Sequence, residues 1–512
     1  MSYATSNKHA RAVDHRTPSR AVRLMPLLPA AAALAVTLAG IGGPSFWLDE
    51  SATVSLAGRP VADLLRVFDH LDLVHAPYYL LMRPWAAVFG TGEPALRLPS
   101  ALATAAAAAG IAVVGRRCHG PLAGLLAGLA YAGGVTVSRY GQEARSYAMV
   151  AAAAVLASYL LVRAVQRDAR RPWLWFAAYA PAVVLLGLLN LDGVLLVPAH
   201  AVTLLAAHRG LARPGRVWAG WSAAVAVAAA ALVPFGLAAS GQKVQIDWLR
   251  TPTWQTAEKL PEFLTGGRWL VAPVLALAVV GAVAGRRSRG TAPLTALAVP
   301  WLLLPPAVLV VVSLVSDPMY TERYVFFCVP ALALLTGAGL ARLGALGRPA
   351  VGAAAVTAVA AAVAAASVPQ HVAIRRQDSR LDDFRAAAQA VRAHARDGDA
   401  IVYLAGIARW GAAAYPRVFG RLRDIGQAQS PVQAENLKGR DLLPRQIRAP
   451  LIRSQRVWVM RTRSIVTRPG DVVWRREQMV LATGPWRVVG TWRFRGGMLT
   501  LLERTGPYRT ST

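Results

Sequence analysis

Two adjacent carboxylates, Asp49 and Glu50, follow the first long apolar run of this 512-residue sequence. Roughly 20 apolar residues span a bilayer, and the run from about Ala21 to Gly43 is long enough to leave both carboxylates at its exit. Ionised groups at that depth are costly, so they need water, a cation or a chemical role. A carboxylate there can remove a proton from an attacking hydroxyl. The alternative is that the pair caps the next helix or binds an arginine.

A second group of reactive side chains lies in the ten residues from Ser138 to Tyr147, which read SRYGQEARSY. Arginine suits phosphate because its planar fork makes paired, charge-assisted hydrogen bonds, and a nearby carboxylate can hold such a fork in position. The candidate ligand-binding residues of this run are Arg139, Tyr140, Gln142, Glu143 and Arg145. The alternative is an interfacial belt with tyrosines at the headgroups and arginines on lipid phosphate.

Three further segments carry candidates. Arg323, in the segment from Asp317 to Tyr324, can complete a phosphate clamp, or it can form a turn with its neighbour Glu322. His75 and Tyr78 are candidate substrate-binding residues of the first outer loop. His75 can orient the base or contact sugar hydroxyls, although a single loop histidine is more often structural. Asp192 can bind a sugar hydroxyl or cap a helix.

Transfer of a sugar from a lipid phosphate to a hydroxyl needs these groups together. A carboxylate removes the proton of the acceptor, and cations hold the phosphate as it leaves, so the leaving group needs no acid. The sequence therefore suggests Asp49 or Glu50 as the base and arginines as the phosphate site.

The composition indicates a polytopic membrane protein. Hydrophobic residues make up 55% of the chain, mostly in long Ala, Leu and Val runs. The net charge of +30 comes from arginines between those runs and along the C-terminal part, so it is read as topological and not as a nucleic-acid site. The two cysteines, in or beside apolar runs, are expected to fill the core, and no spacing suggests a metal site.

The apolar runs predict about eleven transmembrane helices within residues 21–369, preceded by a basic cytoplasmic tail at 1–20. Arginine-rich loops alternate with loops that carry the candidate residues. Two of the arginine-rich loops, with Arg116 and Arg117 and with Arg286 to Arg289, are expected on the same side as the basic N-terminal tail. The positive-inside rule then places all candidate chemistry outside the cell.

Two regions outside the spans are expected to be folded. The first outer loop, residues 45–96, contains an amphipathic helix near Val61 to Leu71. Residues 370–512 have the composition of a small soluble α/β domain outside the cell, with a helix to about Arg396, strands at 400–404 and 456–461, and a hairpin over 486–502.

The order of several motifs resembles the GT-C glycosyltransferases. These motifs are Phe-Trp-Leu-Asp-Glu after the first helix, His-Ala-Pro-Tyr-Tyr-Leu-Leu, Glu93 with Leu96 to Ser100, and the SRYGQEARSY run. The chain is most similar to the bacterial branch related to protein O-mannosyltransferases and lipid A aminoarabinose transferases, chiefly over residues 40–150.

The resemblance implies that Asp49 is the catalytic base with Glu50 as its neighbour, and that His75 and Pro77 belong to the histidine-proline motif. That motif usually reads His-Pro-Pro, whereas Ala76 stands in the middle here. Some relatives also have a lysine after it for the donor phosphate, and an arginine would have to substitute. The resemblance further implies a polyprenyl-phosphate sugar as donor, with mannose as the most common sugar. It also implies inversion at the anomeric carbon and no tightly bound cofactor or metal.

The expected protein is thus a multi-pass enzyme of the plasma membrane whose partners are membrane lipid, the lipid-linked sugar, and a glycan, lipid or protein acceptor of the cell envelope. Two other classes remain open: a carrier or flippase of lipid-linked sugar, and an inactive envelope scaffold. Carriers usually place polar groups mid-helix in two related halves, which this sequence does not show.

Overall fold

The computed structural model describes residues 20–166, 171–242, 248–285, 293–463 and 466–506. Most of the basic tail expected at 1–20, the middle of the basic loop near 163–171, and the arginines at 286–289 lie outside these ranges.

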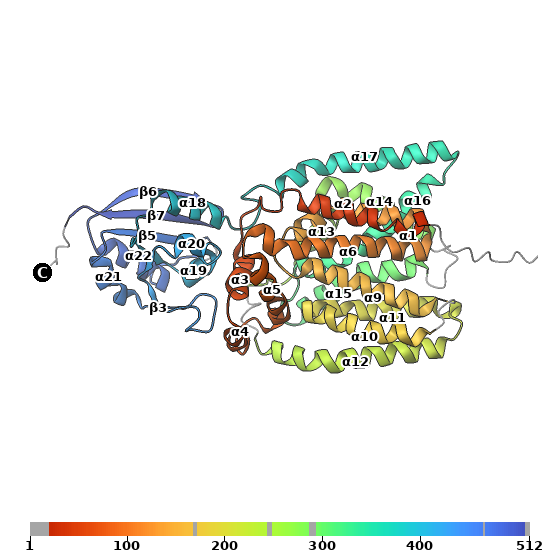
Figure 1. The fold of residues 1–512 in the computed structure, drawn as a ribbon, viewed down its shortest axis with the longest axis horizontal. Helices are drawn as coiled ribbons and strands as arrows, with labels where there is room; N and C mark the ends of the chain where they lie inside the picture. The colour runs from red at the N-terminus through yellow and green to blue at the C-terminus, as the bar shows by residue number, and fades with distance from the viewer. Residues whose placement is uncertain (1–19, 167–170, 243–247, 286–292, 464–465, 507–512) are drawn as a thin grey trace, which may run out of the picture.

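A bundle of long apolar helices forms the larger part of the molecule (Figure 1). Ten segments of the described chain are long and apolar enough to cross a membrane, and a bent helix pair makes an eleventh, which confirms the predicted helical membrane fold. The helices of the ten segments are α1 (Arg20–Leu24) with α2 (Leu27–Leu38), α6 (Glu93–His119), α9 (Tyr147–Val165), α10 (Pro172–Leu189), α11 (Leu196–Ala207), α12 (Pro214–Ser240), α14 (Arg268–Gly285), α15 (Leu294–Val315), α16 (Val329–Gly344) and α17 (Pro349–Ala373).

The bent pair consists of α7 (Pro121–Ala132) and α8 (Val135–Gly141), which meet at 62°. Gly133 and Gly134 separate them, and a glycine pair is a common cause of such a break. The bend carries the arginine-rich run to the end of the bundle that faces the C-terminal domain.

Close packing of small residues holds the centre of the bundle together. A side chain added at Gly337 of α16 would lie 2.3 Å from the backbone of Ala127 in α7, and one at Gly339 would lie 2.0 Å from the backbone of Leu277 in α14. Glycine at these two positions therefore lets three helices approach closely, as is usual in membranes.

The first outer loop folds into three helices at one end of the bundle: α3 (Leu48–Ala57), α4 (Val61–Phe68) and α5 (Ala76–Phe89). In α4, Leu64, Val67 and Phe68 are buried while Arg66 is exposed, so the predicted amphipathic helix is present. Val61 and Leu65, which also belong to its predicted apolar face, are exposed. Figure 1 shows the three helices between the bundle and the C-terminal domain.

The C-terminal domain contains a five-stranded sheet of order β2-β1-β5-β7-β6. The first three strands in this order are parallel, and β7 is antiparallel to both of its neighbours, β5 and β6. The strands of this sheet are β1 (Ala400–Tyr403), β2 (Arg423–Asp424), β5 (Arg456–Thr462), β6 (Trp486–Phe494) and β7 (Gly497–Arg504). A small ladder of β3 (Gln427–Gln429) and β4 (Arg440–Asp441) lies beside it.

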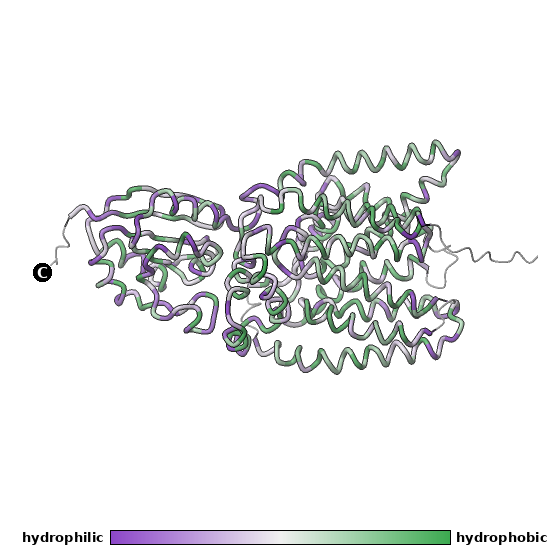
Figure 2. The backbone as a smooth tube through the Cα atoms, in the orientation of Figure 1, coloured by the Kyte–Doolittle hydropathy of each residue, from purple (hydrophilic) through white to green (hydrophobic). Residues whose placement is uncertain are grey.

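Helices cover both faces of this sheet. Side chains alternate along a strand, so Ile401 and Tyr403 of β1 pack on one core while Ala400 and Val402 pack on the other. The covering helices are α18 (Phe384–His394), α19 (Gly406–Ala412), α20 (Pro416–Phe419), α21 (Arg448–Ile452) and α22 (Val472–Ala482). Figure 2 shows the contrast between the apolar bundle and the more polar domain.

Candidate functional site

Asp49 lies in the first turn of α3 and forms an ion pair with Arg323. Nη1 of Arg323 donates to Oδ2 of Asp49 at 2.8 Å, across 274 positions of sequence. The Asp49 side chain is 23% exposed, so an acceptor hydroxyl can reach it. Arg323 lies near the start of the 3₁₀ helix Glu322–Cys328. Its guanidinium group stacks on Trp47 and Trp248, with Cζ 5.5 and 4.7 Å from their ring centroids.

A cavity of about 600 Å³ lies beside this ion pair, and Arg323 lines it whereas Asp49 does not. Its walls come from α8, from α13 (Trp254–Thr265), from the 3₁₀ helix with Arg323 and from the end of α17. Its charged lining consists of three cations and three carboxylates: Arg139, Lys259, Arg323, Glu143, Glu262 and Glu322. A concave site with several convergent charged groups is the usual form of a small-molecule site.

Several polar atoms at this cavity have no hydrogen-bond partner within the described chain. They are Nε1 of Trp47, Nε of Arg139, Oε1 of Glu143 and Nε of Arg323. Buried polar atoms are nearly always hydrogen-bonded, so these four are suited to a polar ligand. Burial raises the pKa of Glu143, while Arg380 and Arg139 oppose that rise.

Glu50, the neighbour of Asp49, is placed differently. It is fully buried and forms a two-pronged ion pair with the equally buried Arg97 of α6, with both N–O distances at 2.7 Å. Its Oε1 also accepts the N–H of Ala144 at 2.8 Å. Arg97 donates in addition to the carbonyls of Ile41 and Pro44, so the pair joins three segments of the chain.

His75 and Arg145 belong to a third cluster, formed around Asp72. Nδ1 of His75 lies 2.7 Å from Oδ1 of Asp72, and the Tyr79 hydroxyl donates to Oδ2 at 2.6 Å. Arg145 then donates to the Tyr79 hydroxyl at 2.8 Å. None of the four lines the cavity, so the structure separates Arg145 from Arg139 and Arg323, although Arg145 still interacts electrostatically with Asp49.

This cluster predicts a pH-dependent stabilisation. Burial alone would raise the pKa of Asp72, but His75, Arg145 and Tyr79 outweigh it and lower the pKa to about 2. Because the unfolded value is about 3.9, the ionised carboxylate stabilises the fold above about pH 4, and that contribution falls as the pH drops toward 2.

We expect Asp72→Asn to lose about 2 kcal/mol of stability at pH 7, the value of a shift of nearly two pKa units. Asparagine also tolerates the left-handed backbone of this position, where φ is 61°. The measurement is thermal unfolding of both proteins in detergent at pH 7 and pH 3. An equal difference at the two pH values would contradict the prediction.

The remaining candidates lie in different surroundings. Tyr140 lines the cavity and packs against Phe326, with ring centroids 4.8 Å apart. Gln142 is fully buried and donates to the carbonyls of Thr37 and Ala39, which ties it to the end of α2. Tyr78 is buried in the core of the outer loop.

Asp192 lies in the 3₁₀ helix Leu191–Leu195, where its N–H binds the side chain of Asn190, and it interacts electrostatically with Tyr324. It does not line the cavity.

Sequence reasoning gave no role to three of the charged residues described above: Asp72, Arg97 and Lys259. Lys259 lies on α13, and the signal for it was a helical segment with charges at positions 258, 259 and 262 between two apolar runs. Arg97 was noticed only as part of a motif. An arginine in the first turns of a long apolar helix requires a buried acidic partner, which points to Glu50.

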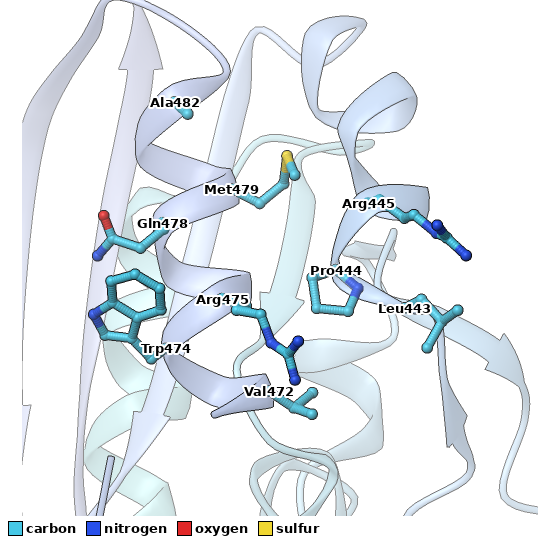
Figure 3. A pocket seen from close by; sticks show the side chains of 9 residues that line it. All are labelled: Leu443, Pro444, Arg445, Val472, Trp474, Arg475, Gln478, Met479 and Ala482. Atoms are coloured by element: carbon cyan, nitrogen blue, oxygen red, sulfur yellow. The ribbon is translucent and has the colours of Figure 1, made fainter. Parts of the chain in front are cut away.

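A second cavity, of about 510 Å³, lies in the C-terminal domain (Figure 3). It is formed between α22 and the turn Pro444–Ile447, and its labelled side chains are Leu443, Pro444, Arg445, Val472, Trp474, Arg475, Gln478, Met479 and Ala482. It holds no carboxylate, and none of the sequence-predicted site residues contributes to it.

Within the described ranges, no group of three or more His, Cys, Asp or Glu side chains is arranged to hold a metal ion.

Comparisons with known proteins relate the chain to membrane glycosyltransferases. Residues 75–235 match the family model of dolichyl-phosphate-mannose-protein mannosyltransferases. A comparison with curated protein sequences gives no match.

Solved structures are similar over nearly the whole chain. ArnT of Cupriavidus metallidurans in the apo state has 15% identity and a TM-score of 0.60, with 93% of this chain and 97% of that chain covered. The same protein bound to undecaprenyl phosphate has 15% identity and a TM-score of 0.60, with 94% of this chain and 98% of that chain covered. The oligosaccharyltransferase of Archaeoglobus fulgidus in the apo form has 10% identity and a TM-score of 0.50, with 96% of this chain and 75% of that chain covered. The chain is therefore a multi-pass membrane protein with the GT-C glycosyltransferase fold, as its motifs predicted.

Proposed function

We propose that this protein transfers a sugar from a polyprenyl-phosphate donor to a hydroxyl of an acceptor at the outer face of the plasma membrane. The observation that carries the proposal is the ion pair of Asp49 with Arg323 at a cavity lined by Arg139 and Lys259. It places a partly exposed carboxylate next to three cationic side chains, which are the base and the phosphate-binding groups that this reaction needs.

The proposed reaction is a single displacement. Asp49 takes the proton of the acceptor hydroxyl as its oxygen attacks the anomeric carbon, and the bond from that carbon to the phosphate oxygen breaks. Polyprenyl phosphate leaves with the bonding electrons, and the configuration at the anomeric carbon inverts. Arg323 contacts both sides of this exchange, since it holds the carboxylate and lines the cavity for the phosphate.

Complementary charges favour a sugar phosphate as the ligand of the cavity. The guanidinium groups of Arg139 and Arg323 suit the phosphate, and the unpaired Oε1 of Glu143 suits a sugar hydroxyl. In the same role, Lys259 takes the place of the lysine that some relatives have after the histidine-proline motif. The proposal needs no tightly bound cofactor.

Two similarities support the choice of donor. A structure of the same fold, ArnT, was solved with undecaprenyl phosphate, and the family model over residues 75–235 is named for dolichyl-phosphate-mannose. Mannose is therefore the first sugar to test. We place the N-terminus in the cytoplasm and the cavity outside, where a glycan, lipid or protein of the cell envelope serves as acceptor.

The test is transfer of label from radiolabelled polyprenyl-phosphate mannose to fractionated envelope acceptors by the purified protein in bilayers. Parallel reactions with other polyprenyl-phosphate sugars identify the donor. The expected result is label in one acceptor fraction. Absence of transfer from every donor, together with no binding of undecaprenyl phosphate, would overturn the proposal.

Substitution of Arg323 should weaken binding of the lipid phosphate. Arg323→Met keeps an apolar side chain but removes the charged guanidinium group that stacks on the two tryptophans, and a hydrogen bond to a charged group contributes about 1.5–3 kcal/mol. We therefore expect the Kd of undecaprenyl phosphate in bilayers to rise by about tenfold or more.

The matched control is Arg376→Met, because Arg376 is 72% exposed and lies in the same region of the molecule without lining the cavity. It should bind the lipid as the unmodified protein does. Equal affinities of the two variants would contradict a phosphate site at Arg323.

A further inference from the structure

The segment that enters the C-terminal domain reaches three parts of the candidate site with three consecutive residues. Arg380 contacts the end of α8, Leu381 lines the cavity, and Asp382 contacts the start of α3. In the sequence, this segment directly precedes α18 and has no predicted role in the chemistry.

Asp382 holds the first residue of the helix that carries Asp49. Its Oδ2 accepts the N–H of Leu48 at 3.2 Å, across 334 positions of sequence. The first N–H groups of a helix have no partner within the helix, and Trp47, which precedes α3, provides no side-chain cap. Asp382 thus supplies from the C-terminal domain the acceptor that α3 lacks, and its charge lies at the positive end of that helix.

A hairpin turn of the C-terminal domain fixes Asp382 from the other side. The N–H of Asp383 donates to the carbonyl of Arg495 at 2.8 Å. Gly496 has a φ of +90°, and a side chain there would lie 2.2 Å from Oδ1 of Asp382 and 3.1 Å from its Cα. Glycine is therefore required at this turn both for its backbone conformation and for the space that Asp382 occupies.

Arg380 holds the end of α8, which forms one wall of the cavity. It is 1% exposed, and its Nη2 donates to the carbonyls of Arg139 and Gln142 at 3.1 Å each. Those carbonyls lie at the end of α8, where the helix dipole favours a cation. Arg380 also interacts electrostatically with Glu143 of the cavity.

We propose that Asp382, assisted by Arg380, is a positioning residue of the transfer reaction, through which the C-terminal domain sets the place of Asp49 relative to the donor. The inference rests on the proposed function. Asp382 holds the backbone of α3, and it neither lines the cavity nor pairs with Arg323, although its charge also interacts electrostatically with that of Asp49.

The test compares steady-state transfer by Asp382→Ala and Asp382→Asn. A displacement of about 1 Å at a reacting group can cost up to about 100-fold in rate, so we expect Asp382→Ala to lower kcat by tenfold or more. The KM for the donor should stay within about twofold, because the phosphate site is intact. Asn keeps an oxygen acceptor for the Leu48 N–H and should restore most of kcat. Hydrogen exchange of the peptide that contains Leu48 should rise in the Ala variant and not in the Asn variant.

The matched control is Asp471→Ala. Asp471 caps α22 within the same domain by accepting the Trp474 N–H and makes no contact with the cavity, so its loss affects the domain alone. Its kcat should equal that of the unmodified protein.

An Asp382→Ala variant with unchanged kcat, or an Asp471→Ala variant with the same loss, would overturn the inference while the proposed function stands. An unmodified protein that neither transfers sugar nor binds undecaprenyl phosphate would overturn both.

Discussion

Replacement of Asp49 by Asn is expected to remove sugar transfer while leaving the fold intact. General base catalysis contributes about 10²- to 10⁴-fold, and an amide cannot take the proton of the acceptor, so kcat should fall by that factor. The amide oxygen can still accept the hydrogen bond from Arg323, and the side chain is 23% exposed, so thermal stability should change little. The measurement is the initial rate of label transfer in proteoliposomes, with thermal unfolding of the same preparation.

The control for this variant is Asp69→Asn. Asp69 is an exposed carboxylate at the end of α4, in the same outer loop but outside the cavity. It should transfer sugar at the unmodified rate. Full activity of Asp49→Asn would reject Asp49 as the base, although the protein would still be a transferase.

The second large effect is expected at Glu50, and it concerns stability. Glu50→Gln keeps the shape of the side chain but leaves Arg97 as an unpaired charge with no exposed surface. Breaking a buried ion pair by removal of one partner costs about 3–5 kcal/mol. We therefore expect a large fall in the thermal unfolding temperature and in the yield of folded protein.

Asp397→Asn is the matched control for Glu50→Gln. Asp397 pairs with Arg421, but the two side chains are 82% and 48% exposed, and exposed pairs contribute at most about 1 kcal/mol. Equal stability of the two variants would contradict a structural role for Glu50. Together with Asp49→Asn, this comparison separates the two adjacent carboxylates: one is expected to govern rate and the other folding.

The sequence predicted the fold well because hydrophobic runs and charge patterns are local signals. About eleven spans, the amphipathic α4, and the strands and hairpin of the C-terminal domain could all be read from periodicity and turn residues. The 62° bend between α7 and α8 was not predicted, since the glycine pair lies inside one continuous apolar run.

The candidate site was predictable only in part, because pairing between distant segments leaves no local signal. Arg323 was one of several arginines predicted to bind the phosphate. Nothing in the sequence shows that Arg323 contacts Asp49 whereas Arg139 and Arg145 do not. Likewise Glu50 and Asp49 have the same chemistry and adjacent positions. Their different surroundings follow from the orientation of α3, which places Glu50 in the core and leaves Asp49 partly exposed.

The buried contact among Glu50, Arg97 and Ala144 has a consequence for how the protein is made. A ribosome delivers Glu50 to the membrane 47 residues before Arg97 and 94 residues before the Ala144 amide. During that interval of synthesis the carboxylate has neither of these partners, so α3 cannot settle until α6 has been threaded into the bilayer and the turn after α8 has emerged. We therefore expect α3 to reach its final place only after α6 has been inserted, and not along with the first span.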